Sequence, residues 1–149
     1  MTQRYERLRV IDLNRALGLI RESYESTGEP HKRRRGRDKG PKVDIDGVSV
    51  RIGSLRLLTF ALKGTVCVEC GKRATHFALE RPPGQDGSYH LNLWAANPDG
   101  TETLFTHDHI HQRSTGGRDE LDNCQPMCQP CNQAKAAEEQ KLFNALSKR

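Results

Sequence analysis

The chain has 149 residues, only 34% of them hydrophobic, and a net charge of +5 at pH 7. This length predicts one domain, or a small domain with an appendage, and the low hydrophobic content predicts a modest core that a structural metal would help to stabilise. The sequence contains neither the apolar core of a signal peptide nor a run of about 18 apolar residues. We therefore expect a cytoplasmic protein with no membrane partner, which excludes the secreted and membrane-spanning classes.

The first half of the chain predicts two helices and a hairpin. Apolar side chains at helical spacing predict an amphipathic helix over residues 12–26. Residues 43–50 alternate between apolar and polar around an Asp-Gly turn, which is typical of a small hairpin. Ser54 and Gly64 are suited to begin and end a second helix over residues 55–63.

The net positive charge of the chain comes from one basic arm, residues 31–42. This arm has a net charge of +6, so the rest of the chain carries −1. Such a run is typical of a solvated linker, or of a polyanion contact that follows a phosphate backbone with little sequence preference. The candidate nucleic-acid-binding residues are Lys32, Arg33, Arg34, Arg35 and Arg37. We expect an N-terminal helical segment over residues 1–27, a basic flexible linker over residues 28–47 and a larger domain over residues 48–149.

The second half predicts strands followed by one long helix, so the expected fold class is α+β. Strands are expected over residues 75–81 and 89–96, and a shorter strand over residues 103–106. Residues 129–147 are rich in Ala, Lys, Glu and Gln, which predicts a helix. The apolar side chains on one side of this helix are Leu142, Phe143 and Leu146.

Four of the five cysteines form two Cys-x-x-Cys pairs, which favours metal ligation in a reducing compartment over disulfides. The pairs are Cys67 with Cys70, and Cys128 with Cys131. Four thiolates are the ligand set of a closed tetrahedral zinc site. The pairs lie too far apart in sequence for a simple zinc ribbon or a redox motif, so the zinc would join two distant parts of the chain. The fifth cysteine, Cys124, is expected to be a small core residue, with a spare metal ligand as the alternative.

A second group of reactive residues lies between the cysteine pairs. Asp108 and His109 are adjacent within a His-Asp-His-Ile-His segment, and a Gly-Gly turn follows them. A carboxylate beside an imidazole suits metal-assisted phosphodiester hydrolysis. The carboxylate ligates a hard divalent cation, and the imidazole takes a proton from the attacking water. Neighbouring residues of a strand face opposite sides, so the strand must end here if both residues are to serve one site.

Two asparagines follow this segment, Asn123 and Asn132. Asn132 is expected at the start of the final helix, where its amide oxygen can complete the shell of the cation. Asn123 lies after the Gly-Gly turn, where its amide can tie down the loop that carries His109. The alternative interpretation is a surface histidine cluster or a second structural metal site, with each asparagine serving as a cap or turn residue.

The combined order of these residues resembles the HNH (ββα-metal) endonuclease family, in the subset whose fold is braced by a four-cysteine zinc site. The resemblance covers about residues 65–136. The matching motifs are Cys67-x-x-Cys70, Thr106-x-Asp108-His109-Ile110, Ser114-x-Gly116-Gly117, Asn123-x-Gln125-x-Met127 and Cys128-x-x-Cys131-Asn132-x-x-Lys135. The sequence departs from the family at Gln112, where many members have proline, and at Cys124, where leucine is usual.

The resemblance implies a small zinc-stapled ββα-metal domain, here with an N-terminal helix and a basic linker. It implies that His109 is the general base and that Asp108 and Asn132 ligate a catalytic Mg²⁺ or Mn²⁺ ion. It also implies that Asn123 orients the histidine loop and that the zinc on the four cysteines is structural.

The function expected from this resemblance is a metal-dependent DNA endonuclease that nicks or cuts duplex or branched DNA. A phage or mobile-element protein in the bacterial host cytoplasm fits the resemblance, with a second copy of the chain or a phage protein as a candidate partner. The rival hypothesis is a non-catalytic zinc-stapled module for DNA binding or for a packaging complex. A degenerate module is expected to have lost Asp108, His109 or Asn132, and this sequence retains all three.

Overall fold

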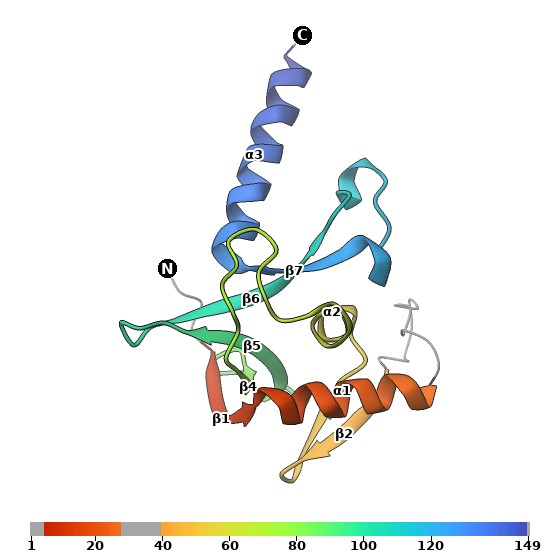
Figure 1. Cartoon of the computed structure of the whole chain (residues 1–149), viewed down its shortest axis with the longest axis vertical. Coiled ribbons are helices and arrows are strands. Elements are labelled where there is room, and N and C mark those ends of the chain that lie inside the picture. Colours follow the sequence, from red (N-terminus) through yellow and green to blue (C-terminus); the bar gives the residue numbers. More distant parts are fainter. Residues whose placement is uncertain (1–4, 28–39, 149) are drawn as a thin grey trace.

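The computed structural model describes residues 5–27 and 40–148 of the chain. Its main feature is a five-stranded antiparallel sheet with the strand order β1-β4-β5-β6-β7 (Figure 1). The strands are β1 (Glu6–Asp12), β4 (His76–Arg81), β5 (His90–Ala96), β6 (Glu102–His109) and β7 (Cys124–Cys128). The strands β4, β5 and β6 are the three that the sequence predicted, and β6 is longer than expected.

In the part of the chain that the structure describes, three α-helices and a separate hairpin complete the fold, with two short 3₁₀ turns at Arg113–Thr115 and Leu121–Asn123. The helices are α1 (Leu13–Thr27), α2 (Leu55–Lys63) and α3 (Gln129–Ser147), and the hairpin joins β2 (Lys42–Ile45) to β3 (Val48–Arg51). All three predicted helices and the predicted hairpin are confirmed, and so is the α+β class. Ser54 caps α2 by accepting a hydrogen bond from the Leu57 backbone N–H at 3.2 Å, and Gly64 ends it at a φ of +113°.

Two strands were not predicted from the sequence, and both lie at the edges of the sheet. β1 pairs with β4, so residues 6–12 belong to the same sheet as the later strands. β7 contains Pro126, which an edge strand tolerates because one side of its backbone needs no ladder hydrogen bonds. Residues 42–45 of the predicted linker form β2. The domain boundaries drawn from the sequence otherwise stay a prediction.

The core lies where α1, α2 and the hairpin pack on the sheet. Ile20, Phe60, Phe77 and Leu93 are among its fully buried side chains. Trp94 is buried as well. Burial of these apolar side chains is the main source of stability in a domain of this size.

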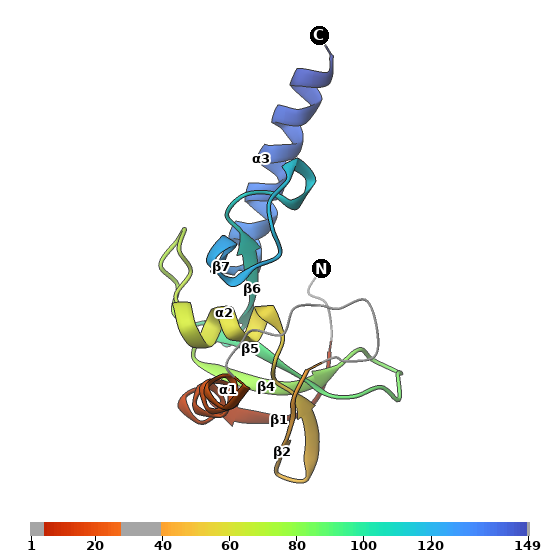
Figure 2. The ribbon, with the colours of Figure 1, turned by 90° about the vertical axis from the view of Figure 1, so that its right-hand side faces the viewer.

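The helix α3 differs from the other two because it projects away from the sheet, as the two views in Figures 1 and 2 show. None of its residues is buried, and Leu142, Phe143 and Leu146 are 58–64% exposed. Its first turn, by contrast, lies against β6 and β7, where the reactive residues of the sequence are gathered. Among the described residues, no helix is long and apolar enough to cross a membrane.

Candidate active site

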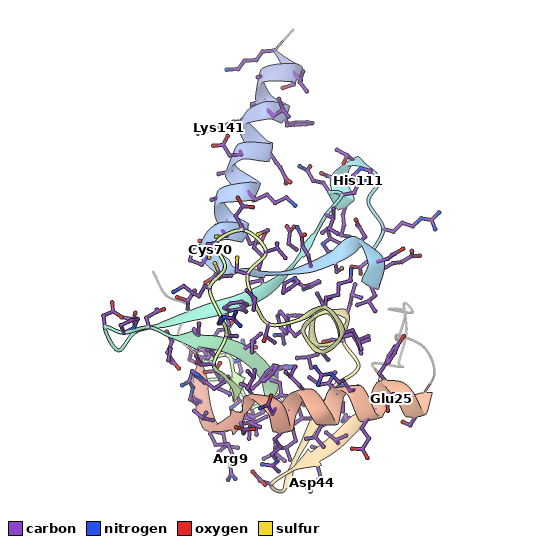
Figure 3. All side chains as sticks on the ribbon, in the orientation of Figure 1. Arg9, Glu25, Asp44, Cys70, His111 and Lys141 are labelled. Carbon is purple, nitrogen blue, oxygen red and sulfur yellow. The ribbon has the colours of Figure 1, made fainter. Side chains whose placement is uncertain are left out.

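The candidate active site is built on β6, β7 and the first two turns of α3. β6 and β7 pair so that Asp108 lies opposite Gln125 and His109 lies opposite Cys124. β6 ends at His109, which is where the sequence leads us to expect the strand to stop. The chain then forms a loop over residues 110–123 and returns as β7, which leads directly into α3. Figure 3 labels His111 on this loop, away from the body of the molecule.

Asn123 holds the loop closed with both ends of its side-chain amide. Its Oδ1 accepts a hydrogen bond from the His111 backbone N–H at 2.9 Å. Its Nδ2 donates to the carbonyl oxygens of His111 at 3.0 Å and of Arg118 at 2.7 Å. The Ile110 N–H also donates to the Asn123 carbonyl oxygen at 2.8 Å. Asn123 therefore acts on the backbone that follows His109, and it does not line the cleft described below.

The Gly-Gly pair serves the same loop. Gly116 adopts a φ of +100°, a conformation that favours glycine. Gly117 approaches the backbone so closely that a Cβ atom there would lie 1.9 Å from the His111 carbonyl oxygen. The Gly117 N–H donates to the Gln112 carbonyl oxygen at 2.8 Å. The loop can close in this way only because residue 117 has no side chain.

Asp108 is 7% exposed and is held from two directions. Its Oδ2 accepts hydrogen bonds from Gln125 Nε2 at 2.9 Å and from Lys135 Nζ at 2.6 Å. The Lys135 ammonium also donates to the His109 carbonyl oxygen at 3.0 Å. Both donors to Asp108 use Oδ2, so the second carboxylate oxygen is not engaged by them. A carboxylate fixed in this way is preorganised to bind a cation.

Asn132 lies in the first turn of α3, and its amide is oriented by β6. Its Nδ2 donates to the Thr106 Oγ1 at 2.8 Å, and that hydroxyl donates in turn to the Met127 carbonyl oxygen at 2.9 Å. Because the amide nitrogen is engaged, the amide oxygen is the atom of Asn132 that can serve a metal.

His109 contacts a residue that the sequence did not single out. Its Nε2 lies 2.8 Å from Asp119 Oδ1, and both side chains are partly exposed. Asp119 comes ten residues later in the chain, and only the closed loop brings it to His109. No sequence spacing indicates this pair, because its distance depends on how Asn123 and Gly117 fold the loop.

An open cleft of about 280 Å³ collects these groups. Three of the predicted site residues line it, Asp108, His109 and Asn132. Arg113, His107 and Glu139 also line the cleft. The cleft therefore combines oxygen ligands, two imidazoles and a guanidinium. This set can hold a divalent cation, accept a proton and contact an anion.

The four paired cysteines form a second site, next to the cleft. The Sγ atoms of Cys67, Cys70, Cys128 and Cys131 all lie within 4.8 Å of one another, and Cys70 Sγ and Cys128 Sγ are 3.8 Å apart. Figure 3 shows Cys70 beside the beginning of α3. This geometry fits a zinc ion with four thiolate ligands, which would join residues 67–70 to β7 and α3.

The close spacing of these thiols also affects their acidity. Burial acts to raise the pKa of Cys67, but hydrogen bonds from the backbone N–H groups of Cys70, Cys128 and Glu69 together lower this pKa to about 6. The neighbouring Cys128 raises the pKa of Cys131. Four thiolates this close together repel one another, and a bound zinc ion removes that repulsion.

Two further predictions have different outcomes. Cys124 is fully buried, as expected of a core residue. The basic-arm residues proposed to contact nucleic acid, Lys32 to Arg37, lie outside the described residues.

Comparison with known proteins identifies a family for part of the chain. Residues 96–138 match the family described as HNH endonuclease. This segment contains β6, the closed loop, β7 and the first turns of α3, and thus every residue of the cleft except Glu139. No curated protein and no solved structure gives a significant match to the chain.

Proposed function

We propose that this chain, which belongs to the HNH endonuclease family through residues 96–138, is a metal-dependent endonuclease that hydrolyses phosphodiester bonds in DNA. The observation that carries the proposal is the meeting of Asp108, His109 and Asn132 at one cleft. These three residue types supply the cation ligands and the base that hydrolysis of a phosphodiester needs.

Asp108 and Asn132 are the proposed ligands of a Mg²⁺ or Mn²⁺ ion. When bound, this ion supplies positive charge that stabilises the phosphate and the leaving oxygen in the transition state. Asp108 suits this role because Gln125 and Lys135 engage only its Oδ2. Asn132 suits it because its hydrogen bond to Thr106 leaves the amide oxygen for the metal. Oxygen ligands of this kind match the preference of hard divalent cations.

His109 is the proposed general base. An imidazole whose Nε2–H donates to a carboxylate presents an unprotonated Nδ1, which can take a proton from water. Asp119 lies at the distance needed for that hydrogen bond. Its negative charge would also stabilise the imidazolium that forms when His109 accepts the proton.

The proposed contacts with the DNA substrate are based on the positive charge of the protein. Arg113 lines the cleft and can donate two hydrogen bonds to a phosphate. The basic arm, with its net charge of +6, would add contacts to the DNA backbone. Binding through such contacts falls with rising salt concentration and shows little preference for sequence. We propose duplex or branched DNA as the substrate on this basis.

The zinc on the four cysteines is proposed to be structural. A closed four-thiolate set leaves no open position for water or substrate. Cys131 directly precedes Asn132, so a zinc ion here would fix the start of α3 and with it one ligand of the catalytic cation.

Cleavage of supercoiled plasmid by the purified protein tests the proposal. We expect nicking or linearisation with Mg²⁺ or Mn²⁺ and none without a divalent cation. His109→Ala should abolish cleavage, whereas His111→Ala, which changes an exposed histidine of the same loop, should retain most of it. DNA binding without cleavage of plasmid or of branched substrates would contradict the proposal and favour the non-catalytic module.

A further inference from the structure

A group of nitrogen and sulfur ligands lies beside the oxygen ligands of the cleft. His107 and His109 are two residues apart at the end of β6, so the two imidazoles share one face of the strand. Cys124 is paired with His109 across the β6–β7 ladder and shares its face. The two imidazole rings are 5.4 Å apart, centroid to centroid.

These three side chains are close enough to share one metal ion. Each offers one ligand atom, and the three atoms all lie within 4.8 Å of one another. A tetrahedral zinc ion with bonds of about 2.0–2.3 Å spaces its ligand atoms at about 3.3–3.8 Å. Rotation of the side chains therefore has to close at most about 1.5 Å. Both histidines line the open cleft, so an ion can reach them from solvent.

The ligand atoms of this group differ in chemistry from those proposed for the catalytic cation. Imidazole and thiolate favour Zn²⁺ and other transition metals, whereas Mg²⁺ favours carboxylate, carbonyl and water oxygens. Two histidines and one cysteine leave a fourth position open, unlike the closed set of four cysteines. Asp119, which lies 2.8 Å from His109 Nε2, provides negative charge beside the group.

We propose that His107, His109 and Cys124 form a second transition-metal site, suited to Zn²⁺, and that zinc bound there inhibits the nuclease. On binding, the Cys124 thiol loses its proton to solvent and its sulfur bonds to the metal. His109 donates a ring nitrogen lone pair to the same ion. Inhibition, which rests on the proposed function, follows because a metal-bound His109 is held away from its role as the base.

Zinc binding tests the site without reference to activity. The full chain carrying one zinc on its paired cysteines is dialysed against Zn²⁺, and bound zinc is then counted per chain. We expect two zinc ions for the unaltered protein and for the control His111→Gln, and one for His107→Gln and for Cys124→Ala. A second zinc ion retained in both of the latter variants, or absent from the unaltered protein, would overturn the site.

Inhibition is tested by adding Zn²⁺ to plasmid cleavage at saturating Mg²⁺. Cleavage by the unaltered protein should fall about tenfold or more as the second site fills, whereas Cys124→Ala should cleave at its basal rate and resist zinc. Equal inhibition of both proteins would mean that zinc acts elsewhere, which would overturn the inhibitory role. If the unaltered protein shows no cleavage at all, the proposed nuclease function fails, while the zinc count still decides whether the site exists.

Discussion

The Lys135 ammonium of α3 lies 2.6 Å from the Asp108 carboxylate of β6 and also donates to the His109 carbonyl oxygen. One lysine thus fixes both neighbouring residues of the proposed site. Asp108 is 7% exposed, and without metal this ammonium is a positive partner for its charge. A bound divalent cation would share the carboxylate with it.

Replacement of Lys135 tests this relationship. In Lys135→Met the buried carboxylate loses its cation, so the free energy of unfolding of the metal-free protein should fall by about 2 kcal/mol. Added Mg²⁺ should restore more stability to this variant than it adds to the unaltered protein. Thermal unfolding with and without Mg²⁺ measures both effects. Lys141→Met is the matched control, because Lys141 is an exposed lysine of the same helix. An equal response of the two variants would contradict the role given to Lys135.

Asp119 is predicted to position His109 for its role as the base. Asp119→Asn keeps the size of the side chain and removes the charge that stabilises the imidazolium, so kcat should fall about tenfold or more with little change in KM. Asp119→Glu, which retains the carboxylate, should recover part of the loss. Steady-state cleavage of an oligonucleotide duplex gives both constants. Asp122→Asn, an exposed aspartate on the same loop, should change neither. A loss confined to KM would assign Asp119 to substrate binding instead.

The close approach at Gly117 predicts a strong effect of one methyl group. In Gly117→Ala the new Cβ would overlap the His111 carbonyl oxygen, so the loop must open and displace Asp119 from His109. A displacement of about 1 Å in a catalytic group can lower the rate by about 100-fold, and we expect a loss of this size in cleavage. Gly87→Ala is the control, because a Cβ there meets nothing within 4 Å. A fully active Gly117→Ala variant would show that the loop need not close for catalysis.

Removal of the proposed structural zinc should abolish activity, because the fold at the start of α3 would lose its support. Cys131→Ser, or treatment with a strong chelator, leaves an incomplete ligand set, and the start of α3 should lose its anchor. We expect a lower unfolding temperature and no cleavage even at saturating Mg²⁺. Cys124→Ala should keep one zinc ion and its cleavage activity. This control distinguishes the effect of losing the zinc from the effect of losing any one cysteine. Full activity of the zinc-free protein with Mg²⁺ would contradict the structural role.

Local signals in the sequence account for the helices, the hairpin and the central strands. Ser54 and Gly64 bound α2 through interactions within a few residues, so their effect is visible without the rest of the fold. The edge strands lack such signals. β1 is charged and mostly exposed, and β7 has a proline at its centre. Both become strands only because a neighbouring strand supplies hydrogen bonds.

Some features of the candidate site can likewise be predicted from the sequence, and others depend on the fold. Asp108, His109, Asn123 and Asn132 follow a recognisable order along the chain, so the sequence alone is enough to propose them as site residues. The contacts of Asp119 with His109 and of Lys135 with Asp108 depend on a loop closure and on a helix packing against a strand. Neither contact follows from sequence spacing.

Chemical rescue of a His109 variant is the sharpest test of whether His109 is the base. His109→Gly removes the proposed base and leaves a space in the cleft that free imidazole can enter. With Mg²⁺ present, we predict that this variant does not cleave plasmid and that added imidazole restores part of the cleavage, while Asp108→Ala gains nothing from imidazole. Cleavage by His109→Gly at the unaltered rate without imidazole would contradict the assignment of His109 as the base.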